Sequence, residues 1–485
     1  MTKIVQKQNK TQSVDQRMIV LEMLLTENVF SHIVVREVLN KYNYLPQQEK
    51  AFMKRLYEGT LERQIELDYV INQYSKIKTE KMKKVICAIM RMSVYQILYM
   101  DAVPNAAACN EAVKLAQKKG FASLKGFVNG VLRNIARNKD NITYTSLSVK
   151  YSMPEWIINL WIEQFGVKTT ETMLAGLLEE HLVTIRFRKM LDSVDVSIED
   201  TVSAVRNALA EQRGTIKQHP YLPCAYCLSG TDDLTKLPYY KNGAFVVQDI
   251  SSMLAIKAIG IEKYVSDLKI QDTKKIITVV DLCAAPGGKS MFAADILEQS
   301  GVNYTIYSRD ISIDKVDTML ENFYRCQLKN IIAEIVDATV EEERLVENAD
   351  IVIADVPCSG FGVIGKKRDI KYRTTPESIA EVIALQKQIL AVAARYLKPG
   401  GRLLFSTCTI NQNENERHFA WLRDVLKLVP LSLNDTLPVC LHTETTQEGY
   451  LQLLPGVHNA DGFFISVFCK PDREGKYQYD GERII

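Results

Sequence analysis

The sequence predicts a multidomain protein of mixed fold class, with an all-α bundle at the N-terminus and an α/β domain with a doubly wound parallel sheet at the C-terminus. Through residues 15–140, apolar side chains recur every three to four positions, as the buried stripe of a helix requires. Beyond residue 240, short apolar runs alternate with helical segments, which is typical of a parallel sheet covered on both faces. The charge balance also changes sign, because residues 1–150 carry 24 Lys and Arg against 13 Asp and Glu, whereas the rest carries 36 against 45.

The N-terminal helices are located by their end signals and by their apolar stripes. Ser31 and Asn105 are expected to act as N-caps, Pro46 to open a long helix, and Gly120 to stop one. The predicted stripes consist of Met18, Leu21, Leu25 and Val29; Phe52, Leu56 and Ile65; Val85, Ile89, Ile97 and Met100; and Phe127, Val131 and Ile135.

Five apolar runs predict the strands of the parallel sheet, at residues 277–282, 304–310, 331–337, 350–356 and 401–407. Two further runs, within 450–456 and 462–470, predict an antiparallel pair near the C-terminus. We therefore expect four segments along the chain. They are a helical domain at 1–145, a connecting α+β region at 146–240, the α/β domain at 241–471 and a polar tail at 472–485.

Composition excludes several classes of protein. The 485 residues are 47% apolar and 24% charged, which rules out wholesale disorder and fibrous architectures. No run approaches the roughly 18 apolar residues of a membrane-spanning helix, and the first residues lack the apolar stretch of a signal peptide. Ten scattered cysteines favour a reducing compartment, so we expect a cytoplasmic protein with no membrane partner. The basic N-terminal part is a candidate for binding nucleic acid, although its charges could equally serve only to solvate helices.

A glycine turn follows the first predicted strand of the sheet. In V-V-D-L-C-A-A-P-G-G-K-S, residues 279–290, the strand ends at Asp281, and Gly287 and Gly288 precede a helix that begins near Lys289. In doubly wound folds a nucleotide-like ligand binds at this place. The string lacks the third glycine of a dinucleotide fingerprint and does not match the Walker loop, so neither of those sites is expected.

Two acids end the next two predicted strands. Asp310 lies 22 residues beyond Gly288, where an acid can accept both hydroxyls of a ribose. Asp337 ends the following strand, beside the same crevice. Each acid alone is more often a loop or cap residue, but two of them after a glycine turn indicate a cofactor site.

Two cysteines, Cys358 and Cys408, follow the fourth and fifth predicted strands and would lie on the rim of that site. Thiols have a chemical use there. Attack of a thiolate on carbon 6 of cytosine makes carbon 5 nucleophilic enough to accept a methyl group, and a second group must then assist loss of the carbon-5 proton. Asp355, three residues before Cys358, is suited to hydrogen-bond the N3/N4 edge of the ring.

The strings around these residues resemble the motifs of RNA cytosine-C5 methyltransferases of the Sun/RsmB type, which use S-adenosyl-L-methionine. The resemblance rests on D-L-C-A-A-P-G-G-K-S, on D-V-P-C-S-G-F-G-V-I-G-K-K-R-D-I-K-Y-R and on S-T-C-T-I-N-Q-N-E-N-E, with further blocks at residues 243–252 and 461–464. Within the bundle, M-R-M-S-V-Y-Q-I-L-Y-M-D-A-V-P-N-A-A-A and G-F-V-N-G-V-L-R-N-I-A-R resemble the NusB-like RNA-binding domain.

The resemblance implies a NusB-like helical domain, a Rossmann-like methyltransferase domain, and methylation of carbon 5 of a cytosine in 16S ribosomal RNA, either free or in a pre-ribosomal particle. Cys408 would be the nucleophile, Cys358 the thiol that assists release, and Asp355 a residue at the boundary between cofactor and base. Asp310 would hold the ribose of the cofactor and Asp337 its adenine. The cofactor loop would consist of Cys283, Ala284, Ala285, Pro286, Gly287, Gly288 and Lys289.

The chain departs from the family at one motif, where the usual R-L-G is replaced by Arg325-Cys326-Gln327 at a helix end. Two alternatives stay open. The same chemistry could act on tRNA or on DNA, whose cytosine enzymes use the Pro-Cys thiol as nucleophile, or the chain could be a non-catalytic RNA-binding assembly factor. We expect a monomer.

His219, Cys224 and Cys227, in H-P-Y-L-P-C-A-Y-C, form the remaining candidate cluster. Only three ligands are visible and no second CxxC follows, so we expect these residues to be structural and no metal to be bound.

Overall fold

The computed structural model divides the chain into two compact units. The helical unit comprises Met1–Glu171 and Gly365–Arg373, and the sheet unit comprises Thr172–Ile364 and Thr374–Ile485. The four segments expected from the sequence divide the chain differently and stay a prediction. The structure describes residues 14–179, 182–189, 197–231, 233–268, 275–472, 477–479 and 482–484. Residues 1–13 and part of the predicted tail lie outside these ranges. None of the described helices is both long enough and apolar enough to cross a membrane.

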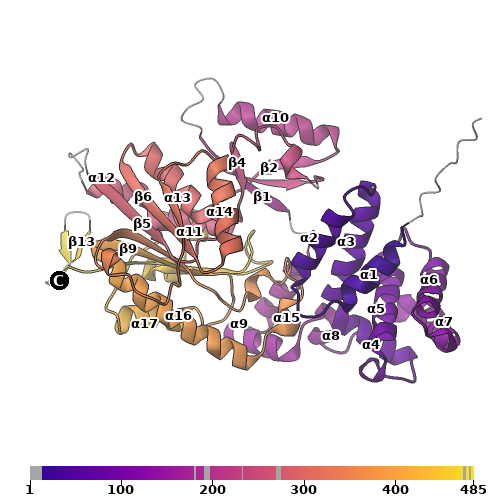
Figure 1. Cartoon of the computed structure of the whole chain (residues 1–485). Helices are drawn as coiled ribbons and strands as arrows, with labels where there is room; N and C mark the ends of the chain where they lie inside the picture. The colour runs from indigo at the N-terminus through magenta and orange to yellow at the C-terminus, as the bar shows by residue number, and fades with distance from the viewer. Residues whose placement is uncertain are drawn as a thin grey trace, which may run out of the picture. The chain divides into compact units, whose positions relative to one another are not determined.

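The helical unit confirms the predicted all-α class (Figure 1). Helix α5 lies at its centre, because the residues from Ile86 to Ile97 are all buried apart from Arg91, and helices α1, α3, α4, α6 and α7 all contact it. Helix α9, Glu155–Gly176, continues into the sheet unit and is kinked at Gly166, which has a φ of 77°. The other elements are α1 Gln16–Leu25, α2 Ser31–Lys41, α3 Gln47–Glu62, α4 Gln64–Tyr74, α5 Lys84–Tyr99, α6 Asn105–Lys118, α7 Lys125–Asn138, α8 Leu147–Tyr151, α15 Ile370–Arg373, and the 3-10 helices Thr79–Lys81, Ala122–Leu124 and Lys139–Asn141.

Some predicted helix ends were wrong. Helix α1 ends at Leu25, before Val29, and Ile65 belongs to α4 rather than to the helix that follows Pro46. Ser31 and Asn105 are the first residues of α2 and α6 rather than their caps, and neither helix has a side-chain cap from its own N-cap residue. For α2 the missing acceptor comes from a distant part of the sequence.

That acceptor belongs to the segment Gly365–Arg373, which packs within the helical unit although its neighbours in sequence belong to the sheet unit. The carboxylate of Asp369 accepts the backbone N–H of Ser31 at 3.0 Å and its hydroxyl at 2.5 Å, and so caps α2. Lys371 is 2% exposed and donates to the backbone oxygens of Glu62 at 2.8 Å and Ser152 at 2.6 Å. Burial lowers the pKa of Lys371 to about 7, because a desolvated ammonium is disfavoured.

The sheet unit is built on an eight-stranded sheet with the order β10-β12-β9-β8-β5-β6-β7, in which β11 also pairs with β12. Strands β5 to β9 are mutually parallel where they pair, and β12 is antiparallel to β9, β10 and β11. The strands are β5 Ile276–Asp281, β6 Asn303–Asp310, β7 Ile331–Ile335, β8 Ala349–Asp355, β9 Leu397–Thr407, β10 Val429–Pro430, β11 Tyr450–Leu453 and β12 Phe463–Cys469. The predicted α/β class and the antiparallel C-terminal pair are therefore confirmed.

Helices cover both faces of this sheet, which explains why its strands read as continuous apolar runs. Along β8, Ile351 and Ile353 belong to the core under α11 to α14, whereas Val352 and Ala354 belong to the core under α16 and α17 (Figure 1). The helices are α11 Ile250–Ile259, α12 Ile261–Asp267, α13 Gly288–Gln299, α14 Ile313–Arg325, α16 Pro376–Tyr396, α17 Glu416–Asp424 and α18 Glu444–Glu448, with 3-10 helices at Glu343–Leu345, Phe361–Val363 and Val439–Leu441.

A smaller antiparallel sheet precedes the large one, with the order β2-β3-β1-β4. Helix α10, Ile198–Glu211, packs on it through Val202, Val205 and Leu209. Its strands are β1 Val183–Phe187, β2 Thr215–Gln218, β3 Ala225–Ser229 and β4 Phe245–Val247, and a 3-10 helix spans Leu234–Lys236. A separate two-stranded sheet near the C-terminus pairs β13 Tyr477–Tyr479 with β14 Glu482–Ile484.

We expect the stability of the helical unit to rise with pH between 7 and 9. At pH values between about 7, its lowered pKa, and the ordinary 10.5, Lys371 binds fewer protons in the folded protein than in the unfolded one. The free energy of unfolding therefore rises with pH in this range. The gain over this window is about 2 kcal/mol. Lys371→Met should lose this dependence in thermal unfolding, whereas Lys54→Met, at an exposed position of α3, should keep it. Identical pH profiles for the wild type and Lys371→Met would contradict the assignment.

Candidate active site

The carboxyl ends of β5, β6, β8 and β9 meet at one edge of the large sheet, because these strands are parallel and adjacent. From β5 the chain continues to β6 and β7 on one side and later to β8 and β9 on the other, so the strand order reverses between β5 and β8. Ligands of open parallel sheets bind outside the carboxyl ends at such a reversal. Most of the site residues predicted from the sequence lie at or just beyond these strand ends.

The loop from Cys283 to Gly287 leads from β5 into α13, which begins at Gly288. Gly287 has a φ of 97°, and a Cβ at this position would lie 2.7 Å from the ring of Phe323. Only glycine tolerates both the conformation and the contact. The loop therefore packs against Phe323 before it enters the N-terminus of α13, a place that favours negative charge.

Asp281, the last residue of β5, is fully buried and has one unpaired oxygen. Its Oδ2 accepts the hydroxyl of Ser290 at 2.7 Å, whereas Oδ1 has no partner among the described residues. Burial raises the pKa of Asp281 to about 7. A buried acceptor without a partner, next to the glycine loop, fits a ligand that donates a hydrogen bond, as the ammonium group of S-adenosyl-L-methionine does.

Asp310 ends β6, next to the end of β5, and is 5% exposed. Its Oδ1 accepts the backbone N–H of Ser312 at 3.1 Å and lies 3.3 Å from the ammonium of Lys315. The cofactor loop is tied to the same strand, because the N–H of Ala284 donates to the backbone oxygen of Arg309 at 2.7 Å. The structure thus brings Asp310 and the loop together, as the sequence predicts.

Asp337 is placed differently from the prediction. Strand β7 ends at Ile335, so Asp337 lies in the following loop and is exposed. Its Oδ1 accepts the hydroxyl of Thr339 at 2.7 Å and the backbone N–H of the same residue at 2.9 Å. These hydrogen bonds lower the pKa of Asp337.

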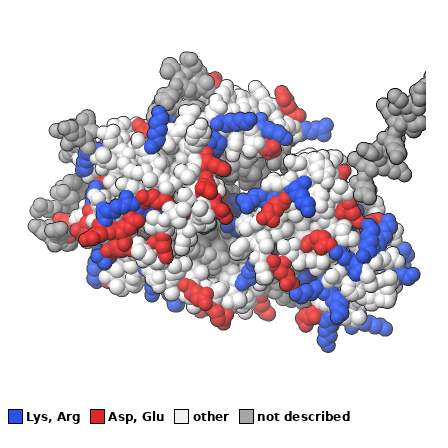
Figure 2. All heavy atoms as spheres, in the orientation of Figure 1, with Lys and Arg blue, Asp and Glu red and all other residues white. Residues whose placement is uncertain are grey.

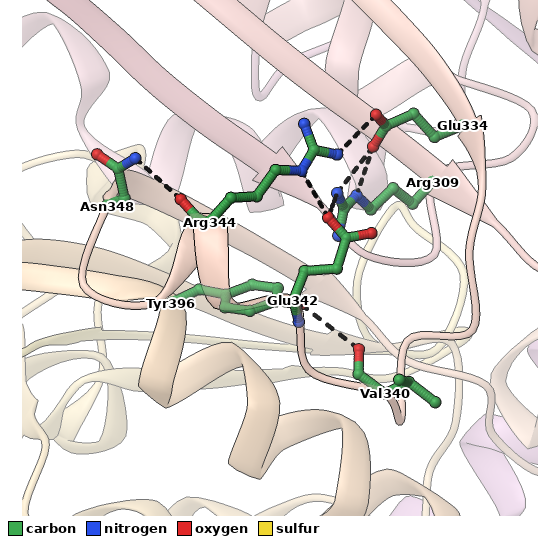
Figure 3. Close-up of polar contacts among 7 residues, drawn as sticks. All are labelled: Arg309, Glu334, Val340, Glu342, Arg344, Asn348 and Tyr396. Carbon is green, nitrogen blue, oxygen red and sulfur yellow. Dashed lines mark hydrogen bonds and ion pairs between the residues drawn. The ribbon is translucent and has the colours of Figure 1, made fainter.

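A buried arginine fixes the loop that carries Asp337. The guanidinium of Arg309, on β6, donates to Glu334 at 2.8 and 3.0 Å and to Glu342 at 3.0 Å (Figure 3). Arg344 contacts the same two carboxylates, at 2.8 Å for Glu334 and 2.7 Å for Glu342. Because these acids flank the loop on both sides, its two ends are held against β6.

Asp355, at the end of β8, forms an ion pair with Lys289 of the cofactor loop at 2.7 Å. Ser406 of the adjacent strand β9 donates its hydroxyl to the other carboxylate oxygen at 2.8 Å. Burial disfavours the charge on Lys289, but the attraction of Asp355 outweighs it and raises the pKa of Lys289. The pairing of Lys289 with Asp355 was not predicted; it connects the glycine loop to the cysteine motif.

Cys358 and Cys408 lie just beyond β8 and β9, and their Sγ atoms are 3.3 Å apart. The structure thus brings the two thiols together at the ends of adjacent strands. The pKa of Cys358 is raised well above its ordinary value by its hydrogen bond with Cys408, and burial adds to the effect. All ten cysteines lie within the described residues, and none of them forms a disulfide.

A buried carboxylate that the sequence analysis did not single out connects the two cysteine loops. Glu414 accepts hydrogen bonds from Ser359, next to Cys358, and from Asn411, near Cys408. The available signal was weak: Glu414 is one of several polar residues in S-T-C-T-I-N-Q-N-E-N-E, and nothing in the spacing indicates that its side chain points inward.

Two glycines bring the loop after Cys358 against the block at residues 461–464. The backbone N–H of Gly362 donates to the oxygen of Cys408 at 3.1 Å, and the N–H of Gly462 donates to the oxygen of Gly362 at 3.0 Å. A Cβ on Gly362 would overlap the carbonyl of Gly462. This close approach gives a physical reason for glycine at both positions.

The remaining features singled out from the sequence are His219 with Cys224 and Cys227, and the helix end at residues 325–327. Both ring nitrogens of His219 contact backbone groups, of Asn459 at 2.9 Å and of Tyr221 at 3.2 Å. Within the described ranges no three His, Cys, Asp or Glu side chains gather in a way that would hold a metal ion. At the departure from the family motif, Gln327 adopts a φ of 56°, a conformation that glycine adopts more readily.

Lys and Arg side chains gather over part of the helical unit, in the region of α4 to α7 (Figure 2). Several of them are paired with acids of the same unit, for example Lys84 with Glu27 at 2.5 Å and Lys118 with Asp15 at 2.6 Å. The exposed members are Lys76, Lys78, Lys81, Lys83, Lys84, Lys114, Lys118, Lys125, Arg133 and Arg137.

The chain combines a helical domain with a parallel sheet whose strand order reverses beside the loop of residues 283–289. This combination defines a class of protein, the Rossmann-like methyltransferases with a NusB-like N-terminal domain. A family model for the 16S rRNA methyltransferase RsmB/F matches residues 266–469, and the model of the NusB family matches residues 16–137. The crystal structure of PH0851 has the same fold, with a TM-score of 0.72 at 23% identity over 94% of this chain and 99% of that one.

Relatives match over nearly the whole chain. The probable ribosomal RNA small subunit methyltransferase B of Bacillus subtilis is 32% identical over 472 residues, which cover 94% of this chain and 98% of the relative. The corresponding protein of Synechocystis is 29% identical and covers 93% and 98%. The chain belongs to the 16S rRNA methyltransferase RsmB/F family, and its cofactor is S-adenosyl-L-methionine.

We expect Gly362→Ala to destabilise the sheet unit, because the added methyl group must displace the backbone of Gly462. The cost of such overpacking is about 1–3 kcal/mol, which denaturant unfolding can measure. Gly130→Ala is the matched control, since no atom lies within 4 Å of its Cβ position in α7, and it should stabilise its helix slightly. Equal stability of Gly362→Ala and the wild type would show that the loop is not held by this contact.

Proposed function

We propose that the protein methylates carbon 5 of a cytosine in 16S ribosomal RNA through a covalent bond between Cys408 and carbon 6 of the base. The observation that carries the proposal is the 3.3 Å separation of the Cys358 and Cys408 sulfurs at the ends of two adjacent strands. Methyl transfer to oxygen or to an exocyclic nitrogen needs no thiol, whereas carbon 5 of cytosine must be activated before it can attack a methyl group. The names of the relatives support ribosomal RNA as the substrate.

The cofactor supplies an electrophilic methyl group on a sulfonium ion. Cys408, as a thiolate, forms a bond to carbon 6, and the electron pair of the 5,6 double bond becomes available at carbon 5 to take up that methyl group. A water molecule then takes up the carbon-5 proton, the electron pair of that C–H bond re-forms the 5,6 double bond, and the bond between carbon 6 and the sulfur breaks, which returns Cys408 as a thiolate. The base must be unpaired or flipped out for the thiolate to reach it.

Asp355 and Lys289 have electrostatic roles in this scheme. The carboxylate of Asp355 can accept a hydrogen bond from the N4 amino group, which orients the ring over the thiols. Lys289, 2.7 Å from that carboxylate, supplies positive charge close to the ring as negative charge develops on it. Both groups are held before the base arrives, so little reorganisation is needed during the reaction.

Cys358 has the role of assisting release. Its raised pKa keeps it a neutral thiol beside Cys408, so that it does not compete as the nucleophile. A neutral thiol at 3.3 Å can hydrogen-bond to the sulfur of Cys408 as the bond to carbon 6 breaks.

For the cofactor, we propose that the loop from Cys283 to Lys289 and the buried Asp281 bind its amino-acid part, and that Asp310 accepts the ribose hydroxyls. Asp337 is the proposed contact to the adenine, through the carboxylate oxygen that Thr339 does not use. RNA binding by the exposed Lys and Arg of the helical unit, a monomeric state and a cytoplasmic location complete the proposal. The free thiols that the mechanism requires are consistent with a reducing compartment.

Asp310→Ala should weaken cofactor binding by about 2 kcal/mol, because a charge-assisted acceptor for two hydroxyls is lost. Calorimetric titration with S-adenosyl-L-methionine measures the effect. Asp317→Ala, at an exposed position of α14, should leave the affinity unchanged. If Asp310→Ala binds as tightly as the wild type, the ribose contact lies elsewhere.

The two cysteines should behave differently on 16S RNA transcribed in vitro. With the cofactor present, Cys408→Ala should form no covalent complex and no 5-methylcytosine, because the route to an activated carbon 5 is lost. Cys358→Ala should still attack and transfer the methyl group but release RNA slowly, so a protein–RNA adduct should persist on a denaturing gel. Bisulfite sequencing locates the methylated base, and Cys440→Ala, at an exposed position, is the control.

The reverse pattern, with an adduct in Cys408→Ala and none in Cys358→Ala, would make the Pro-Cys thiol the nucleophile, as in the DNA enzymes. Full activity in both variants would overturn the covalent mechanism. Methylation of tRNA or DNA in place of 16S RNA would leave the chemistry intact and change the substrate.

A further inference from the structure

The carboxylate of Glu414 is fully buried and accepts four hydrogen bonds. The backbone N–H of Ser359 donates at 2.8 Å and its hydroxyl at 2.5 Å, the amide of Asn411 at 2.8 Å and the amide of Gln386 at 3.1 Å. Ser359 is in the loop after β8, Asn411 is in the loop after β9, and Gln386 is on α16. One side chain therefore connects three elements around the two thiols.

Both cysteine loops are held close to this carboxylate. Ser359 follows Cys358 directly, and its hydroxyl also lies 2.6 Å from the hydroxyl of Thr409, which follows Cys408. The loop of Cys408 is fixed from its other side by Asn415, which accepts from Thr407 at 2.6 Å and donates to the backbone oxygen of Thr409 at 3.1 Å. The separation of the two sulfurs thus depends on a network in which Glu414 is the shared acceptor.

Within the part of the chain that the structure describes, the four hydrogen bonds of the Glu414 carboxylate all come from neutral groups. The nearby His418 contacts the amide oxygen of Gln386 at 2.8 Å, and burial lowers the pKa of His418 to about 4, so this ring is neutral as well. A buried negative charge in surroundings of low polarity acts strongly on neighbouring groups.

This charge acts on Cys358. After its hydrogen bond with Cys408 and its burial, repulsion by Cys408 and by Glu414 further raises the pKa of Cys358. The negative carboxylate of Glu414, to which Ser359 donates, therefore disfavours a thiolate at Cys358.

We propose that Glu414 is a positioning residue that holds the two cysteine loops in register, and that its negative charge adds to the effects that disfavour a thiolate at Cys358. Glu414 touches neither the base nor the cofactor in this scheme. The inference rests on the proposed function, in which Cys408 attacks the base and Cys358 assists release. It gives a reason why two adjacent thiols have these different roles.

The test compares four variants of the full chain. Glu414→Gln removes the charge but keeps the size of the side chain, and Glu414→Asp keeps the charge on a shorter one. Ser359→Ala removes the hydroxyl contacts and leaves the carboxylate in place. Glu416→Gln is the matched control, because Glu416 is a second acid only two residues away, is partly buried, and has one oxygen without a partner among the described residues.

The first measurement needs neither RNA nor turnover. Each protein is treated briefly with iodoacetamide at pH 8, and mass spectrometry gives the alkylation of Cys358 relative to Cys408, with the exposed Cys440 as internal standard. In the wild type, Cys408 should react first. In Glu414→Gln the relative labelling of Cys358 should rise at least about threefold, because each unit of pKa changes the thiolate fraction tenfold. Ser359→Ala, Glu414→Asp and Glu416→Gln should keep the wild-type order.

The second measurement is methyl transfer to 16S RNA. Glu414→Gln, Glu414→Asp and Ser359→Ala should each lower kcat by about tenfold or more with KM nearly unchanged, since misplaced reacting groups slow the chemical step rather than binding. Glu416→Gln should match the wild type. Cofactor affinity, measured by calorimetry, should be the same in all variants and shows that each one is folded.

Several outcomes would overturn the inference. Wild-type labelling in Glu414→Gln would remove the role of the charge, and wild-type kcat in both Glu414 variants would remove the positioning role. A raised labelling ratio in Glu416→Gln would mean that any buried acid here has the same effect.

If the wild type methylates no RNA at all, the proposed function fails, whereas the labelling order of the thiols still tests Glu414. Should Glu414→Gln not fold, the comparison of Glu414→Asp with Ser359→Ala decides, because a raised Cys358 labelling in either would contradict the proposal.

Discussion

Parallel pairing of β8 with β9 sets Asp355 opposite Ser406, and the geometry of the site depends on this register. The two cysteines are 50 residues apart in sequence, and the pairing brings their sulfurs to 3.3 Å. A shift by one residue would turn every side chain of one strand to the other face of the sheet. Apolar cores on both faces prevent such a shift, since Ile351 and Val352 are each fully buried on opposite sides.

Charges at the site are distributed in two separate groups. On the cofactor side, Lys289 pairs with Asp355, so the local charge is nearly balanced where a cationic cofactor and a developing negative ring would meet. Next to the cysteine loops, Glu414 accepts hydrogen bonds from neutral groups of the described part of the chain. The loop of Cys358 thus begins at a carboxylate that is paired with a cation and continues to Ser359, which donates to a carboxylate held by neutral groups.

Much of the fold and of the site could be predicted because the information was local. Apolar runs identify buried strands, and Asp310, Cys358 and Cys408 follow them directly, so parallel pairing brings them to one edge. Contacts between distant segments could not be predicted in this way. From its neighbouring residues alone, Ser31 is predicted to be the N-cap of a helix. The side chain that caps α2 is instead Asp369, more than 300 residues away. The inward orientation of Glu414 and the exposed position of Asp337 likewise depend on loops whose paths no periodicity specifies.

The segment Gly365–Arg373 also has a consequence for the order in which the protein is made. The helical unit is otherwise complete at Glu171, but the residues that cap α2 and pair with Glu62 come from this later segment. At the usual rates of translation they leave the ribosome roughly 10 to 40 seconds after the rest of the unit. During synthesis α2 therefore stays uncapped, and Glu58 and Glu62 of α3 lack their partner Arg368, until β5 to β8 of the large sheet have been made. In this protein the unit that comes first in sequence is finished only after four of the eight strands of the large sheet have been synthesised.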